Sequence, residues 1–214
     1  IAELKGMMPV CSWTTIQHVI SVSTWFIFFM YIEHLGERSL AVSNIVRGVS
    51  GLLWMVTEAF ASTCSTLVSN IIGAGREDKV WSLLKRILKL SYGVVMSFAL
   101  LFCIFPSAVI SIYTDIPDLI PATIPSMVVM CSSYLFTVGA MVLFQAVSGT
   151  GSTKTAFRLE LAALVIYTLY CTVIVGIMKL DIAICWTAEH VYAIGLLVLC
   201  YSYMKSGRWR NRAI

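Results

Sequence analysis

The chain has 214 residues, of which 59% are hydrophobic and 12% charged, and its formal net charge is +4. Soluble domains carry about a quarter charged residues, so this composition excludes a soluble protein and indicates an integral membrane protein. Six apolar runs of about 20 or more residues are long enough to cross a bilayer. We expect helices, because barrel strands are only about ten residues long and lipid cannot satisfy an open backbone.

The sequence therefore predicts an all-α integral membrane protein, built as one six-helix transmembrane bundle. The expected spans cover approximately residues 9–32, 40–72, 88–113, 118–147, 159–179 and 182–204. Seven cysteines fall inside these spans without a C-x-x-C pair, so we interpret them as small hydrophobic residues and not as a metal site. The opening IAELKG lacks the pattern of a signal peptide, and we expect none.

Lysines and arginines are distributed unevenly around the predicted spans. Twelve of the 15 flank one side, at residue 5 and in the segments 76–89, 154–158 and 205–212. Because basic residues accumulate on the cytoplasmic side, both termini are predicted to be cytoplasmic. The basic stretch 79–89 is amphipathic, and we expect it to lie at the membrane interface before the third span.

Two of the predicted cytoplasmic turns carry a pair of glycines. The first turn is NIIGAGREDK, with Gly73 and Gly75, and the second is SGTGSTKT, with Gly149 and Gly151. We expect these glycines to let the second and fourth helices end. The second turn does not fit a phosphate-binding P-loop, because threonine rather than glycine precedes its lysine and a membrane helix precedes the motif.

The first span carries a polar stripe after Pro9. Its members are Thr14, Gln17, His18 and Ser21. Histidine is the side chain best suited to proton coupling at physiological pH, but a membrane histidine is also a common hydrogen-bonding partner of a neighbouring helix. Both roles remain open for His18.

A second polar stripe follows one face of the second span, within a sector of about 100° on a helical wheel. Its members are Asn44, Arg47, Gly48, Gly51, Glu58, Ser62, Ser65 and Ser69. Small residues suit close helix packing. Glu58 is different, because an ionisable group near mid-span costs several kcal/mol unless it is paired or lines a wet cavity. Arg47 lies nearer the outer surface, where its side chain can extend to water.

The later spans carry fewer ionisable groups. The uncharged polar residues of the fourth span are Ser132, Ser133, Thr137 and Gln145. In the sixth span, WTAEHVY places Glu189 and His190 between aromatic residues that suit interfacial anchoring. Glu189 is a further candidate for a functional acid.

Several segments together resemble the multidrug and toxic compound extrusion (MATE) family. They are the proline near the mouth of the first span, GERSLAVSNIVRG, STLVSNIIGAGREDK and AVSGTGSTKT, of which TLVSNIIGAG is the most specific. The family's transporters have twelve helices in two six-helix halves. The chain is similar to the second half, which would place Pro9 in helix seven, Glu58 in helix eight and Thr137 in helix ten.

The resemblance implies a secondary antiporter, not an enzyme, that exports bulky and often cationic organic compounds by alternating access. It implies Na⁺ or H⁺ as the coupling ion, no other cofactor, a plasma (inner) membrane location and no nucleic-acid partner. The expected partner is the N-terminal six-helix half or a second chain. Some family members carry coupling acids where this chain has Gln17 and Thr137. Coupling is then expected to rely on acids of the other half, or on Glu58 and His18.

Alternatives concern the substrate and the class of protein. A cavity lined by Gln17, His18, Glu58 and Thr137 would suit a flat cation, because aromatic faces attract cations and methionines adapt to varied shapes. Candidate wall residues are Trp25, Trp54, Met55 and Tyr134. A flippase for lipid-linked oligosaccharides or polysaccharides, from the same wider superfamily, would instead need a basic cavity, for which Arg47 is the available residue. An intramembrane enzyme is disfavoured, because no nucleophile pairs with a base and H-E-x-x-H is absent.

Overall fold

The computed structural model describes residues 2–210, with side chains described for residue 12 and residues 15–210. The predicted all-α membrane fold is confirmed, because six helices in this part of the chain are long and apolar enough to span a bilayer. The α-helices are α1 (Ala2–Glu33), α2 (Glu37–Gly73), α3 (Val80–Ile104), α4 (Pro106–Ile110), α5 (Leu119–Gly149), α6 (Thr153–Cys171), α7 (Ile182–Cys185) and α8 (Ala188–Lys205). A 3-10 turn, η1 (Glu77–Lys79), precedes α3, and a π-helix, η2 (Thr172–Ile177), continues α6.

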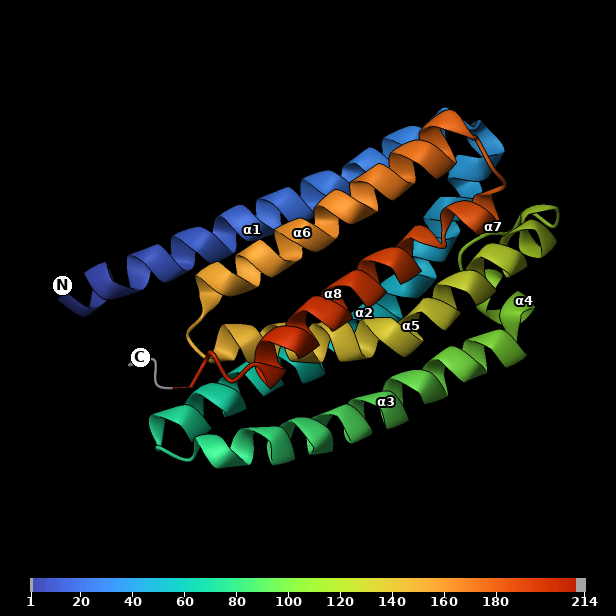
Figure 1. The fold of residues 1–214 in the computed structure, drawn as a ribbon. Helices are drawn as coiled ribbons and strands as arrows, with labels where there is room; N and C mark the ends of the chain where they lie inside the picture. The colour runs from blue at the N-terminus through green and yellow to red at the C-terminus, as the bar shows by residue number, and fades with distance from the viewer. Residues whose placement is uncertain (1, 211–214) are drawn as a thin grey trace.

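The helices form an elongated bundle with α5 at its centre (Figure 1). α5 contacts α2, α3, α6 and α8, and most of its residues in the second half are buried. α1 lies beside α6 on one side of the bundle, and α3 lies on the other side against α5 and α2 (Figure 1). α1 begins and α8 ends at the same end of the bundle, where the α2 to α3 and α5 to α6 connections also lie.

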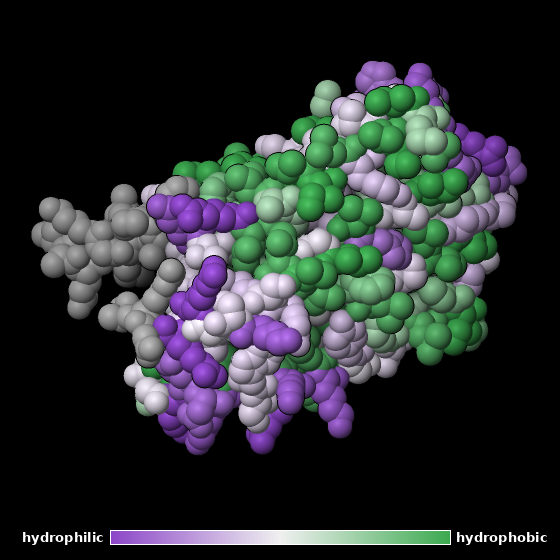
Figure 2. Space-filling view, viewed as in Figure 1, coloured by the Kyte–Doolittle hydropathy of each residue, from purple (hydrophilic) through white to green (hydrophobic). Residues whose placement is uncertain are grey.

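The surface of the bundle is apolar along much of its middle. Figure 2 shows hydrophobic residues over the middle of one face and hydrophilic residues gathered toward the two ends. The exposed apolar residues include Leu100, Leu101 and Ile104 on α3. Lipid chains provide an environment in which this surface is stable, and the chain is therefore a multi-pass membrane protein.

The third span differs from the prediction made from the apolar run. That run predicted a span over 88–113 after a separate interfacial stretch, whereas α3 is continuous over Val80–Ile104. No proline or glycine interrupts its basic first half, and Leu84 and Ile87 in that half are buried in the core. Pro106 then begins α4, because proline lacks the backbone N–H that would continue α3. The span is therefore shifted toward the N-terminus.

The turn after α2 shows why glycine is needed there. The N–H of Arg76 donates to the carbonyl oxygen of Ile71 at 3.0 Å, and the N–H of Gly75 donates to that of Ile72 at 2.8 Å. This pair of bonds is a Schellman motif, which requires a left-handed residue just after the helix. Gly75 occupies that position with φ 68°, and Gly151 has φ 76° after α5.

Gly75→Ala should lower the stability of the protein, and Gly73→Ala should not. At neither glycine does an atom lie within 4 Å of the position that an added Cβ would occupy, so crowding does not distinguish them. Only Gly75 has a positive φ, where an L-residue costs roughly 1–2 kcal/mol. Thermal unfolding of the two purified variants in detergent tests this difference. Equal unfolding temperatures for the two variants would contradict it.

α2 and α5 cross at close range near their C-terminal ends. A Cβ atom placed on Gly149 would lie 2.5 Å from the carbonyl oxygen of Ser65. Oγ of Ser69 donates a hydrogen bond of 2.8 Å to the carbonyl oxygen of Gly149. The small residues at this end of the polar stripe therefore serve close helix packing, one of the two roles considered from the sequence.

Candidate functional site

The polar stripe on α2 is exposed over the part that precedes the crossing with α5. Asn44, Arg47 and Gly51 are exposed, while Val46 and Val49 on the other side of α2 are buried in the core. This part of the stripe therefore faces away from the core of the described bundle. A polar face on a membrane-spanning helix needs water or another protein body against it, because lipid offers no hydrogen bonds.

Glu58 lies near the middle of α2, where the open part of the stripe meets the core. Its side chain is partly buried, and Nε2 of Gln145 on α5 donates a hydrogen bond of 3.1 Å to Oε1. Within the described residues, Glu58 forms no ion pair. His18 on α1 is exposed and lies close enough to interact electrostatically with Glu58. The site thus holds a carboxyl group beside one neutral donor and one titratable imidazole.

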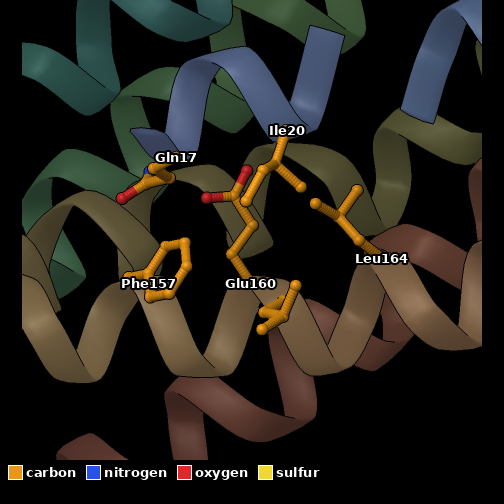
Figure 3. Close-up of a pocket in the computed structure, with 6 residues that line it drawn as sticks. Gln17, Ile20, Phe157, Glu160 and Leu164 are labelled. Carbon is orange, nitrogen blue, oxygen red and sulfur yellow. The ribbon is translucent and has the colours of Figure 1, made fainter. Parts of the chain in front are cut away.

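A second carboxyl group, that of Glu160 on α6, lies between α1 and α6 and is 6% exposed. Oγ of Ser21 on α1 donates a hydrogen bond of 2.5 Å to its Oε1. Gln17 on α1 and Tyr192 on α8 also face this carboxyl group. Figure 3 shows the carboxyl group pointing from α6 toward α1, beside a narrow crevice that Gln17 helps to line.

Glu160 is a candidate that the sequence did not reveal. The fifth span was expected to start at residue 159, which would place Glu160 at the cytoplasmic boundary beside Arg158. α6 instead starts at Thr153, so Glu160 lies about two turns, or roughly 10 Å, inside the helix. The sequence did contain one indication of this site. Glu160 is an acidic residue at the start of the fifth apolar run, whereas the charged residues just before it, Lys154 and Arg158, are basic.

Glu189 and His190 are neighbours on α8 and face different helices. The hydroxyl of Tyr167 on α6 donates to Oε1 of Glu189 at 3.5 Å, and Trp25 on α1 faces the same carboxyl group. Nε2 of His190 lies 2.9 Å from Oγ of Ser132 on α5. The predicted candidate Glu189 therefore lies in contact with α6 and α1, while His190 links α8 to α5.

Three other predicted candidates are not placed beside a carboxyl group by any contact in the described structure. Thr137 is buried in α5, and its hydroxyl donates a hydrogen bond of 3.0 Å to the carbonyl oxygen of Ser133 in the same helix. Asn44 is exposed on α2. The guanidinium carbon of Arg47 lies 5.3 Å from the centre of the Phe29 ring, which is a cation–π contact between α2 and α1.

The four polar residues that were predicted to line one cavity do not all meet in the structure. Gln17 lines the crevice beside Glu160, and His18 interacts electrostatically with both Glu160 and Glu58. Thr137 bonds within its own helix and joins neither group. The side chains of two residues of the first span, Pro9 and Thr14, lie outside the described residues.

The four predicted wall residues do not line one cavity, and Trp25 on α1 faces Glu189. Trp54 is 42% and Met55 is 70% exposed on α2, close in sequence to Glu58. Tyr134 is buried instead, and its hydroxyl donates a hydrogen bond of 2.9 Å to the carbonyl oxygen of Ser50. Trp54 and Met55 are thus exposed in the described bundle, whereas Tyr134 stabilises the contact between α5 and α2.

Comparison with known proteins gives one family. A family model described as MatE matches residues 14–173, which is well over half of the chain. The matched range includes Glu58 on α2, Glu160 on α6 and both glycine turns. A search of curated proteins gave no match.

Proposed function

The chain belongs to the MatE family of membrane transporters, and on that premise we propose that it is the C-terminal half of a secondary active antiporter. The transporter exports organic, often cationic, compounds across the plasma membrane in exchange for H⁺ or Na⁺. Family membership supports transport itself and disfavours an enzyme.

Glu58 is the observation that carries the proposal. Its carboxyl group lies at mid-span, is partly buried and has Gln145 as its hydrogen-bonding partner. His18 interacts with this carboxyl group electrostatically, but among the described residues no basic side chain forms an ion pair with it. An acidic group held in a membrane without an ion pair is costly, which supports a role in binding a cation there. The same group serves a proton, a sodium ion or a cationic substrate in turn, and exchange between them is the basis of antiport.

The residues near Glu58 support an organic cation as substrate. Met55 and Trp54 are exposed on α2 within about one turn of Glu58. A methionine side chain adapts to ligands of different shape, and the face of an indole ring attracts a positive charge. A flat organic cation therefore gains apolar contact and charge neutralisation at one place.

The open polar stripe supports a partner body. Asn44, Gly51 and Ser62 are exposed on α2 in the described bundle. Gated transport requires two bodies that move against each other around a site near the middle of the membrane. We assign the N-terminal six-helix half, or a second chain, to the position opposite this stripe.

A flippase for lipid-linked saccharides has weaker support. Among the described residues of the α2 stripe, Arg47 is the basic member, and its guanidinium group lies over Phe29. A site for a polyanionic lipid headgroup needs several basic groups that converge on it. We therefore favour the antiporter.

Movement of an organic cation driven by an ion gradient in proteoliposomes tests the proposed function. The purified full-length protein is reconstituted, and an imposed H⁺ or Na⁺ gradient should accelerate movement of a fluorescent organic cation in the opposite direction. Ionophores that collapse the gradient should remove the acceleration, and liposomes without protein are the control. Movement of the organic cation that neither gradient affects would contradict antiport.

A further inference from the structure

We propose that Glu160 is a second, buried proton-binding site, located between α1, α6 and α8 and separate from Glu58. The inference deepens the proposed function, and its role in transport rests on that function. Protonation of Glu160 would hold α1 against α6, and loss of the proton would require water or a rearranged helix to reach the carboxylate.

One oxygen of the Glu160 carboxyl group lacks a hydrogen-bonding partner among the described residues. Glu160 is 6% exposed, and its Oε1 accepts a hydrogen bond from Ser21. Its other oxygen, Oε2, is fully buried. Gln17 and Tyr192 face the carboxyl group, but no described residue meets hydrogen-bonding geometry to Oε2. Burial of a negatively charged carboxylate with an unpartnered oxygen costs far more than burial of a neutral carboxylic acid, because protonation removes the net charge. The closed arrangement of α1 and α6 therefore fits the protonated form.

The side chains around the Glu160 carboxyl group are mostly apolar. The crevice beside the carboxyl group is lined by Gln17 and Glu160 and otherwise by apolar residues, namely Ile20, Phe157, Leu161 and Leu164 (Figure 3). A hydrated metal cation needs several oxygen ligands and space for water, which apolar side chains do not supply. A proton needs neither, so the proton is the cation that this site fits.

The groups facing Glu160 connect it to the open face of the protein. The titratable groups around it are His18 on α1, and Tyr192 and Cys200 on α8. His18 is exposed and also interacts electrostatically with Glu58. The imidazole of His18 therefore lies within electrostatic range of both carboxyl groups.

Infrared difference spectroscopy tests the site without any transport assay. The purified full-length protein in lipid nanodiscs is titrated with alkali, and the C=O stretch of protonated carboxyl groups is followed. The wild type should lose a component that Glu160→Gln lacks at every pH. The exposed Glu33→Gln is the matched control and should retain that component. An unchanged carboxyl signal in Glu160→Gln would overturn the proposal.

Two further measurements keep the test decisive. Ser21→Ala retains the carboxyl group and removes its donor, so the Glu160 component should persist at a higher frequency; its persistence at the wild-type frequency would count against the site. Addition of sodium chloride at fixed pH should leave the component in place. Its loss in sodium chloride, but not in choline chloride, would identify a sodium site and overturn the proposal.

The same measurements separate this inference from the proposed function. A Glu160 component in a protein that moves no organic cation would refute the antiporter and support the proton site. Gradient-driven transport by a protein that lacks the Glu160 component would support the antiporter and refute the proton site.

Discussion

Glu58→Gln should abolish export of organic cations by the full-length protein while leaving normal amounts of it in the membrane. Glutamine has nearly the same shape as glutamate and can still bond to Gln145, so the contact between α2 and α5 should survive. It cannot carry a negative charge or exchange a proton, and the site would lose its attraction for cations. Export of a fluorescent organic cation from cells, normalised to protein in the membrane, measures the effect.

Glu33→Gln provides the matched control for Glu58→Gln. Glu33 is the last residue of α1 and is exposed, so the same change of charge is made away from the polar stripe. Export by Glu33→Gln should equal that of the wild type. Unchanged export by Glu58→Gln at equal expression would remove Glu58 from the mechanism.

Gly149→Ala should strongly destabilise the bundle. The added Cβ would lie 2.5 Å from the carbonyl oxygen of Ser65 and 3.0 Å from its Cα, and these backbone atoms cannot move without shifting α2. Overpacking of this kind typically costs roughly 1–3 kcal/mol. Separation of α2 from α5 would also stretch the hydrogen bond from Ser69 to Gly149. We expect a lower unfolding temperature and a lower yield of purified protein.

Gly93→Ala is the control for the Gly149 variant. Gly93 lies within α3, and no atom lies within 4 Å of the position that its Cβ would occupy. Alanine favours an exposed helix interior by about 1 kcal/mol relative to glycine, so this variant should be as stable as the wild type or slightly more stable. Equal unfolding temperatures for Gly93→Ala and Gly149→Ala would contradict the close crossing of α2 and α5.

The membrane fold could be predicted because its main signals are local. An apolar run of sufficient length predicts a spanning helix without knowledge of its neighbours, and a glycine after the run indicates where the helix ends. Helical periodicity also placed Glu58 on a polar face of α2, because that periodicity is a property of one helix. The third span was displaced because hydropathy did not register the helix interruption at Pro106.

The partners of the carboxyl groups could not be predicted in this way. Ser21 and Glu160 are 139 residues apart in the chain and meet only because α1 lies beside α6. Periodicity within each helix does not determine which helices become neighbours. The same reason explains why Thr137 was expected in a cavity, since its bond to Ser133 and its burial in α5 follow from the packing around that helix.

The central claim is that Glu58 couples cation entry to export of the substrate. The most direct measurement is the flux of H⁺ and of Na⁺ that an organic-cation gradient drives in proteoliposomes carrying either the wild type or Glu58→Gln. We predict an opposite flux of one of these ions in the wild type and none in the variant. Equal ion flux in both proteins would contradict the claim.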